Sequence, residues 1–139
     1  ALLHDRRGST AIFAALSMSA MLGFVALGVD AAHWLHLRQR AQAVADAAAM
    51  AAVLGRDDTP DEALAMAAAH GLVDGNDGVT VTAGWRKAHG EVVIDVDIRQ
   101  AAPMHFAQLL LRTPVSIAVH ASAAADCAAK GGCRARLIG

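Results

Sequence analysis

The segment 10–29 contains no charged side chain, and its length of about twenty residues is what a helix needs to span the hydrocarbon core of a bilayer. Arg6 and Arg7 stand before it, and the segment 31–54 continues without proline or glycine and becomes amphipathic. The sequence therefore predicts one unbroken helix over 9–54 that leaves the membrane. At about 1.5 Å per residue this helix is about 70 Å long, so its second half has to pack on protein.

The distribution of basic residues predicts the orientation of the chain. Arg6 and Arg7 favour a cytoplasmic N-terminus, which places the rest outside the cytoplasm, although Arg38 and Arg40 on the far side weaken this bias. A secretory signal peptide is the alternative interpretation of the N-terminus. Its apolar core is usually about 7 to 15 residues long, whereas the run here is longer and continues into a helix.

The bulk composition limits what the remainder can be. After one membrane segment, 139 residues leave room for a single small domain, and the formal net charge of −1 argues against a nucleic-acid partner. We expect a basic N-terminal segment at 1–8, a long helix at 9–55 and a small domain at 56–139.

Small residues recur along one stripe of the long helix. Such a stripe lets helix backbones approach closely in lipid, so it predicts packing against copies of the same helix. An alanine-rich span also produces this spacing without any function. The residues are Ala11, Ala15, Ser19 and Gly23 in the membrane half, and Ala41, Ala45, Ala48 and Ala52 beyond it.

In the small domain at 56–139, the sequence predicts a short helix followed by strands. Gly55 is expected to end the long helix, and 59–62 forms a capping box that opens a short helix to His70, ended by Gly71.

Alternating apolar runs at 79–85 and 92–99 predict a β-hairpin, and 115–121 predicts a third strand. Between them, Pro103 opens a two-turn helix over 104–111. We therefore expect an α+β fold in which a three-stranded antiparallel sheet and short helices pack on the outer half of the long N-terminal hydrophobic helix.

Two cysteines stand near the C-terminus. Cys127 and Cys133 enclose the flexible stretch Ala-Ala-Lys-Gly-Gly, and in an exported domain this spacing favours a disulfide that closes a short loop. Free thiols and metal binding are the other interpretations, but no second cysteine pair or nearby histidine completes a tetrahedral set.

Asp30 is the most informative single charge, because it falls where the apolar run ends and a carboxylate in lipid is costly. It either marks the outer membrane interface or pairs with Arg38 or Arg40 of a neighbouring subunit and sets the register between long helices.

Other polar residues offer weaker metal hypotheses. His33 and His36 lie three residues apart on the helix, but beside Trp34 they suit the headgroup interface better. Asp95 and Asp97 share one strand face and could attract calcium, although a solvated face explains them better. We expect no metal site at either place.

The sequence contains no nucleophile motif, phosphate loop or zinc signature, so we expect neither enzymatic activity nor a cofactor. A ligand-binding module with its site between the sheet and the 104–111 helix is a further hypothesis. With only 4% aromatic residues, the chain has little of what usually lines such a pocket.

Four strings carry a family resemblance: Asp-Arg-Arg-Gly-Ser-Thr-Ala at 5–11, Gly-Val-Asp at 28–30, Leu-Arg-Gln-Arg-Ala-Gln at 37–42 and Ala-Asp-Ala-Ala-Ala at 45–49. Together with the apolar span they resemble the N-terminal region of the TadE/TadG-like proteins of the tight-adherence, or Flp, pilus system. The resemblance implies a type IV pilin-like protein of the bacterial inner membrane, with copies of itself in a helical filament, other Tad pilus components and the membrane as partners.

One position departs from the pattern of pilins in this system. They typically carry a glutamate five residues after the glycine at the processing site, whereas Phe13 is the fifth residue after Gly8. TadG-like members often lack this glutamate. The resemblance thus implies either a structural subunit of a cell-surface filament or, alternatively, a non-polymerising inner-membrane scaffold or minor pseudopilin of Tad pilus assembly.

Overall fold

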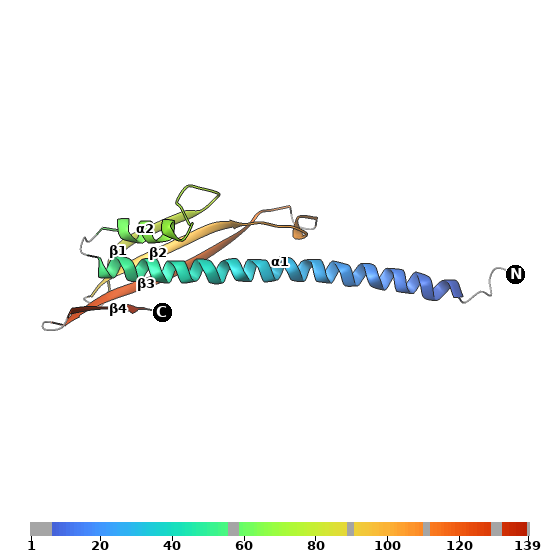
Figure 1. Ribbon diagram of the computed structural model, residues 1–139, viewed down its shortest axis with the longest axis horizontal. Helices are drawn as coiled ribbons and strands as arrows, with labels where there is room; N and C mark the ends of the chain where they lie inside the picture. The colour runs from blue at the N-terminus through green and yellow to red at the C-terminus, as the bar shows by residue number, and fades with distance from the viewer. Residues whose placement is uncertain (1–6, 56–58, 89–90, 110–111, 129–131, 139) are drawn as a thin grey trace.

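A single 48-residue helix dominates the computed structural model, which describes residues 7–55, 59–88, 91–109, 112–128 and 132–138. This helix, α1, spans Arg7–Leu54. Its N-terminal half projects beyond the domain, and its C-terminal half lies against it (Figure 1). The predicted long helix is therefore confirmed over the described residues.

The domain after α1 is built from one short helix and an antiparallel sheet with the strand order β1-β2-β3-β4. Each strand pairs antiparallel with the next along the chain. The elements are α2 (Asp61–Ala69), β1 (Thr80–Ala88), β2 (Glu91–Ala102), the 3-10 turn η2 (Ala107–Leu109), β3 (Val115–Ala128) and β4 (Gly132–Leu137).

The expectation of three strands was wrong, because β4 adds a fourth that pairs with β3. Its sequence, Gly-Cys-Arg-Ala-Arg-Leu, alternates apolar residues with two arginines, but it is only six residues long and its apolar side chains are mostly small. Ala135 packs against the core, while Leu137 stays 44% exposed. Pairing with the long strand β3, rather than burial of large side chains, accounts for β4.

The short helix α2 was predicted correctly in position, and Gly71 ends it. Gly71 adopts φ +84°, and the N–H groups of Gly71 and Leu72 donate to the carbonyl oxygens of Ala68 and Ala67, both at 2.9 Å. This is the Schellman arrangement that favours glycine. The predicted capping box is wrong, because α2 has no side-chain cap hydrogen bond at its N-terminus.

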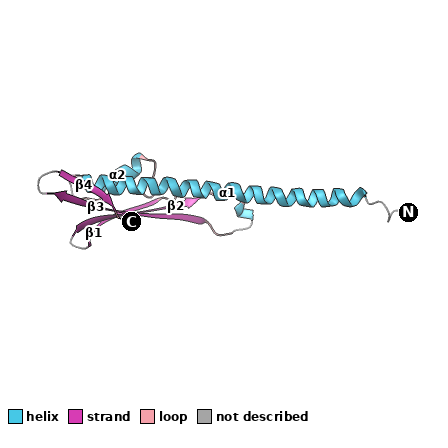
Figure 2. Ribbon diagram, turned by 90° about the horizontal axis from the view of Figure 1, so that it is seen from below, coloured by secondary structure: helices cyan, strands magenta, loops and turns pink. Residues whose placement is uncertain are grey.

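The core lies between α1 and one face of the sheet, which runs as a separate layer along the helix (Figure 2). Alternate residues of the strands point into it because successive side chains of a strand face opposite sides. On β2 these are Ile94, Val96 and Ile98, which are all fully buried. From α1 the core receives Ala41, Val44, Ala45, Ala48, Ala49, Ala52 and Val53.

Candidate functional site: the apolar half of α1 and its junction with the domain

Residues 8–29, called the apolar half of α1 below, are exposed along their whole length except at Ala26, which is half-buried. Large apolar side chains project on several sides of it, and Phe13 and Phe24 are 70% and 75% exposed. Among the described residues, α1 is the one helix long and apolar enough to cross a membrane. This half of the helix therefore requires a bilayer or other apolar helices around it.

The small-residue stripe of the apolar half is open. Ala11, Ala15, Ser19 and Gly23 are all exposed. The Ser19 hydroxyl donates to the carbonyl oxygen of Ala15 at 3.0 Å, which satisfies it within the helix. The stripe thus presents a narrow surface without an unmet polar group, as close helix packing requires. Its role in assembly stays a prediction.

The second set of small residues lies elsewhere. Ala41, Ala45, Ala48 and Ala52 are at most 1% exposed, because the sheet of the same chain and α2 cover them. They pack inside the subunit, where no other copy of the chain can reach them. Residues 30–54, called the domain half of α1 below, therefore use the same small side chains for contact with their own domain.

Asp30 stands at the boundary between the two halves and is 1% exposed. Its carboxylate accepts hydrogen bonds from three consecutive backbone N–H groups, those of His105 (3.3 Å), Phe106 (2.8 Å) and Ala107 (2.5 Å). These donors lie at the start of η2, where a short helix leaves its first N–H groups unpaired. Asp30 thus holds the segment before β3 against α1.

Two further contacts hold the same segment. The indole Nε1 of Trp34 donates to the carbonyl oxygen of Pro103 at 3.0 Å. The rings of His33 and His105 meet edge to face, with centroids 5.6 Å apart. We call Asp30, Trp34 and His33, together with the segment 103–107 that they contact, the junction clamp. The expected two-turn helix over 104–111 is here reduced to η2, and 110–111 lie outside the described residues.

Arg38, Arg40 and His36 do not take part in the junction clamp. Arg40 donates to the carbonyl oxygen of His70 at the end of α2 (3.1 Å), and Arg38 and His36 are exposed. Pairing of Asp30 with Arg38 or Arg40 of a neighbouring subunit stays a prediction. No group of three metal-ligating side chains occurs among the described residues.

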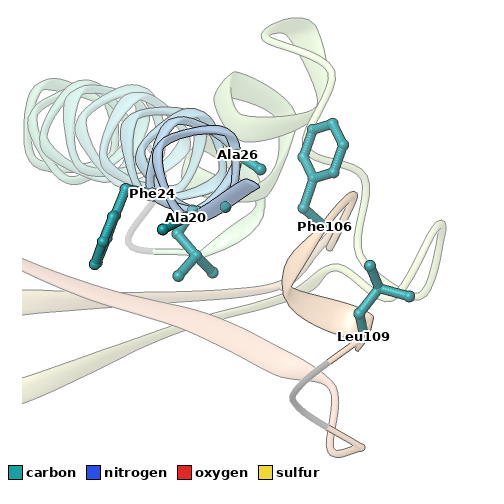
Figure 3. A pocket seen from close by; sticks show the side chains of 7 residues that line it. Ala20, Phe24, Ala26, Phe106 and Leu109 are labelled. Atoms are coloured by element: carbon teal, nitrogen blue, oxygen red, sulfur yellow. The ribbon is translucent and has the colours of Figure 1, made fainter. Parts of the chain in front are cut away.

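An apolar groove of about 350 Å³ lies beside the clamp, between the apolar half of α1 and η2. Phe106 and Leu109 form one wall, opposite α1 (Figure 3). They are 45% and 84% exposed, so their apolar surface is open to the surroundings. The groove lacks the convergent polar groups of a small-molecule site. Its lining residues are Ala20, Gly23, Phe24, Ala26, Leu27, Phe106 and Leu109.

The sheet face turned away from α1 carries a polar network. Asp95 pairs with Arg86 and accepts a hydrogen bond from the Ser122 hydroxyl at 2.5 Å. His120 lies between Ser122 Oγ (Nε2, 2.9 Å) and Asp97 Oδ1 (Nδ1, 3.1 Å). Burial alone raises the pKa of Asp95, but the hydrogen bonds from Ser122 and Arg86 and the nearby positive charge lower it below its ordinary value.

This network does not look like a catalytic one, although it places a serine, a histidine and an aspartate in a row. Ser122 is 5% exposed and donates its proton to Asp95. A nucleophile needs an accessible hydroxyl whose proton goes to the base. Sequence reasoning identified Asp95 and Asp97 but missed His120 and Ser122, which occupy alternate, outward positions of β3.

The cysteines meet in the backbone register. β3 and β4 pair Cys127 with Cys133 as direct partners across the sheet. The side chains at both positions lie outside what the structure describes, so the disulfide stays a prediction.

Comparison with known proteins adds one finding. Residues 8–70 match the model of the Tad family, described as Flp pilus-assembly TadE/G-like. The match covers α1 from its second residue, and α2, but none of the sheet. No curated protein and no solved structure matches the chain significantly.

Proposed function

We propose that the chain is a pilin-like subunit that assembles through α1 into a bacterial surface filament, on the basis of the match of residues 8–70 to the TadE/G-like Flp pilus-assembly family. The family match supports a part in Tad pilus assembly. The filament role is the more specific step. In this role, copies of the chain and other Tad components are its partners.

The observation that carries the proposal is the contrast in burial along α1. The domain half is packed against the sheet of its own chain, whereas the apolar half is exposed along nearly its whole length and has only η2 beside its C-terminal end. Water cannot surround such a surface, because contiguous apolar patches of this size are covered in native proteins. In a helical filament of identical subunits, the apolar half of each helix is buried by the helices of its neighbours.

The small-residue stripe predicts which face of α1 packs against neighbouring helices. Ser19 and Gly23 lie on one side of α1, and at about 100° per residue Ser17 lies about 200° away from Ser19. Close packing against neighbouring helices through the stripe places Ser19 in a contact too narrow for a large side chain. Ser17 faces the opposite side, where Met21 and Phe24 already make the surface bulky.

The experiment is electron microscopy of filaments sheared from cells, combined with N-terminal sequencing of the main protein band. We expect this chain to be the repeating subunit. Ser19→Leu is expected to lower the amount of chain in the sheared fraction strongly, and Ser17→Leu serves as the matched control, because it adds the same side chain two residues away.

The alternative is a non-polymerising inner-membrane scaffold or minor pseudopilin. Arg6 and Arg7 before the apolar run, and Phe13 in place of the glutamate typical of pilins, favour an N-terminus that remains in the membrane. Recovery of the chain only from the membrane fraction, with Ser17→Leu and Ser19→Leu behaving alike, overturns the filament proposal and supports this alternative.

A further inference from the structure

The apolar groove lies at the depth of the membrane, not above it. Its residues on α1, from Ala20 to Leu27, precede Asp30 by three to ten positions. At about 1.5 Å per residue they lie about 5 to 15 Å along the helix from Asp30 toward the N-terminus. If the hydrocarbon core begins at the end of the uncharged run 10–29, the groove lies within the half of the bilayer nearer the domain, which is about 15 Å thick.

The clamp determines the height of Phe106 and Leu109. The three hydrogen bonds from 105–107 to Asp30 and the bond from Trp34 to Pro103 tie this segment to α1 just above the groove. The backbone at 105–107 therefore cannot move away from α1 without breaking the hydrogen bonds to Asp30, of which the one from Ala107 is buried. The domain holds two large apolar side chains beside the membrane-spanning part of the helix.

From the groove toward the domain, the side chains change from apolar to polar aromatic, as they do between the hydrocarbon core and the headgroups of a membrane. The groove itself is lined by apolar side chains only. Directly above it lie His33, Trp34 and His105, ring side chains of the kind that favour the headgroup region.

We propose that Phe106 and Leu109 insert into the domain-side leaflet of the membrane, where acyl chains of phospholipids fill the groove against Ala20 to Leu27. The domain then rests on the bilayer through a second, shallow anchor next to the spanning helix. This anchor fixes the domain's height and tilt at the membrane. The inference rests on membrane anchoring of α1 and not on polymerisation.

The test uses the full chain in phospholipid vesicles, with Cys127 and Cys133 replaced by serine and a fluorophore attached at Leu109→Cys. Lipids that carry a nitroxide on the acyl chain quench a fluorophore within the leaflet, and iodide quenches one in water. Val92→Cys is the matched control, because Val92 is also an exposed apolar residue, 46% exposed, on β2. β2 begins at the end of the sheet remote from the apolar half (Figure 1).

We expect the fluorophore at position 109 to be quenched several-fold more by the acyl-chain nitroxide than the one at 92, and several-fold less by iodide. Equal iodide quenching at the two positions overturns the proposal. Protection at 109 that disappears when the chain is diluted in lipid also overturns it, because the groove is then covered by a second copy. Neither result depends on filament formation, since the vesicles contain the chain without the assembly machinery.

Discussion

The two halves of α1 are similar in sequence and opposite in environment. Both are rich in alanine and both carry small residues at helical spacing, yet Ala15 is exposed and Ala45 is fully buried. The domain half meets the apolar face of the sheet, and the apolar half extends past it (Figure 1). A stripe of small residues therefore indicates close packing but does not identify the partner, which here is the chain's own sheet for one half.

The boundary between the halves is a polar one. Asp30 directly follows the apolar half and is the first buried residue of the domain half, and it binds the backbone of the segment before β3. The carboxylate at this point has two roles. It ends the uncharged run of the helix, and it accepts hydrogen bonds from the backbone of the domain. The same residue thus separates the membrane part from the folded domain and attaches one to the other.

Enlarging an alanine separates the two halves most strongly. Ala45→Leu adds three carbon atoms to a site with 0% exposure, so we expect the free energy of unfolding of the domain to fall by about 3 kcal/mol. Ala15→Leu in the apolar half is expected to change it by less than about 0.5 kcal/mol. Urea unfolding of the detergent-solubilised chain, followed by tryptophan fluorescence, measures both. Equal losses would contradict the burial contrast.

Removing Asp30 tests the boundary. Asp30→Ala leaves three backbone N–H groups without their acceptor, so we expect the free energy of local opening of 105–107 to fall by about 2 kcal/mol. Hydrogen exchange of these amides measures the opening. Asp46→Ala is the control, because Asp46 accepts its hydrogen bond from Gln42 of the same helix. Unchanged exchange in Asp30→Ala would show that the clamp does not depend on the carboxylate.

The smallest effect is expected on the outer face of the sheet, away from both halves of α1. The pKa of Asp95 is lower in the folded chain than its ordinary value of 3.8, so its contribution is present above about pH 4 and is lost as the pH falls through the folded-state pKa. Asp95→Asn is expected to cost about 1 kcal/mol at pH 7 and less at pH 3.

Urea unfolding at the two pH values gives this difference. Ser122→Ala removes a hydrogen bond that favours the ionised Asp95, so it is expected to weaken the pH dependence without abolishing it. If Asp95→Asn lowers stability equally at pH 7 and pH 3, the carboxylate is not the titrating group.

Much of the fold followed from periodicity. The uncharged run, the change to an amphipathic pattern after Asp30 and the two-residue alternation of 92–99 predicted α1 and β2 close to their observed bounds. Gly71 correctly marked the end of α2, because a left-handed residue there favours glycine. These features are local, so neighbouring residues alone contain the signal.

The candidate site was predicted only in part. Asp30 was singled out by its position, but its partners lie 75 to 77 residues away in the chain, where no sequence pattern indicates an N–H cluster. The groove was missed because Phe106 and Leu109 were assigned to a helix of the domain. β4 was missed because its alternating run is short and its apolar side chains are mostly small, so its pairing with β3 is the clearest sign of a strand.

The sequence by itself determined that the chain has a membrane-length helix, which continues into a domain with an alternating sheet, since hydrophobic length and period are properties of consecutive residues. Only the tertiary structure decided which alanines are covered, where Asp30 finds its donors and that Phe106 and Leu109 lie beside the apolar half of α1. Burial and hydrogen bonding depend on residues distant in the chain, and their positions are known only once the sheet has packed against the helix.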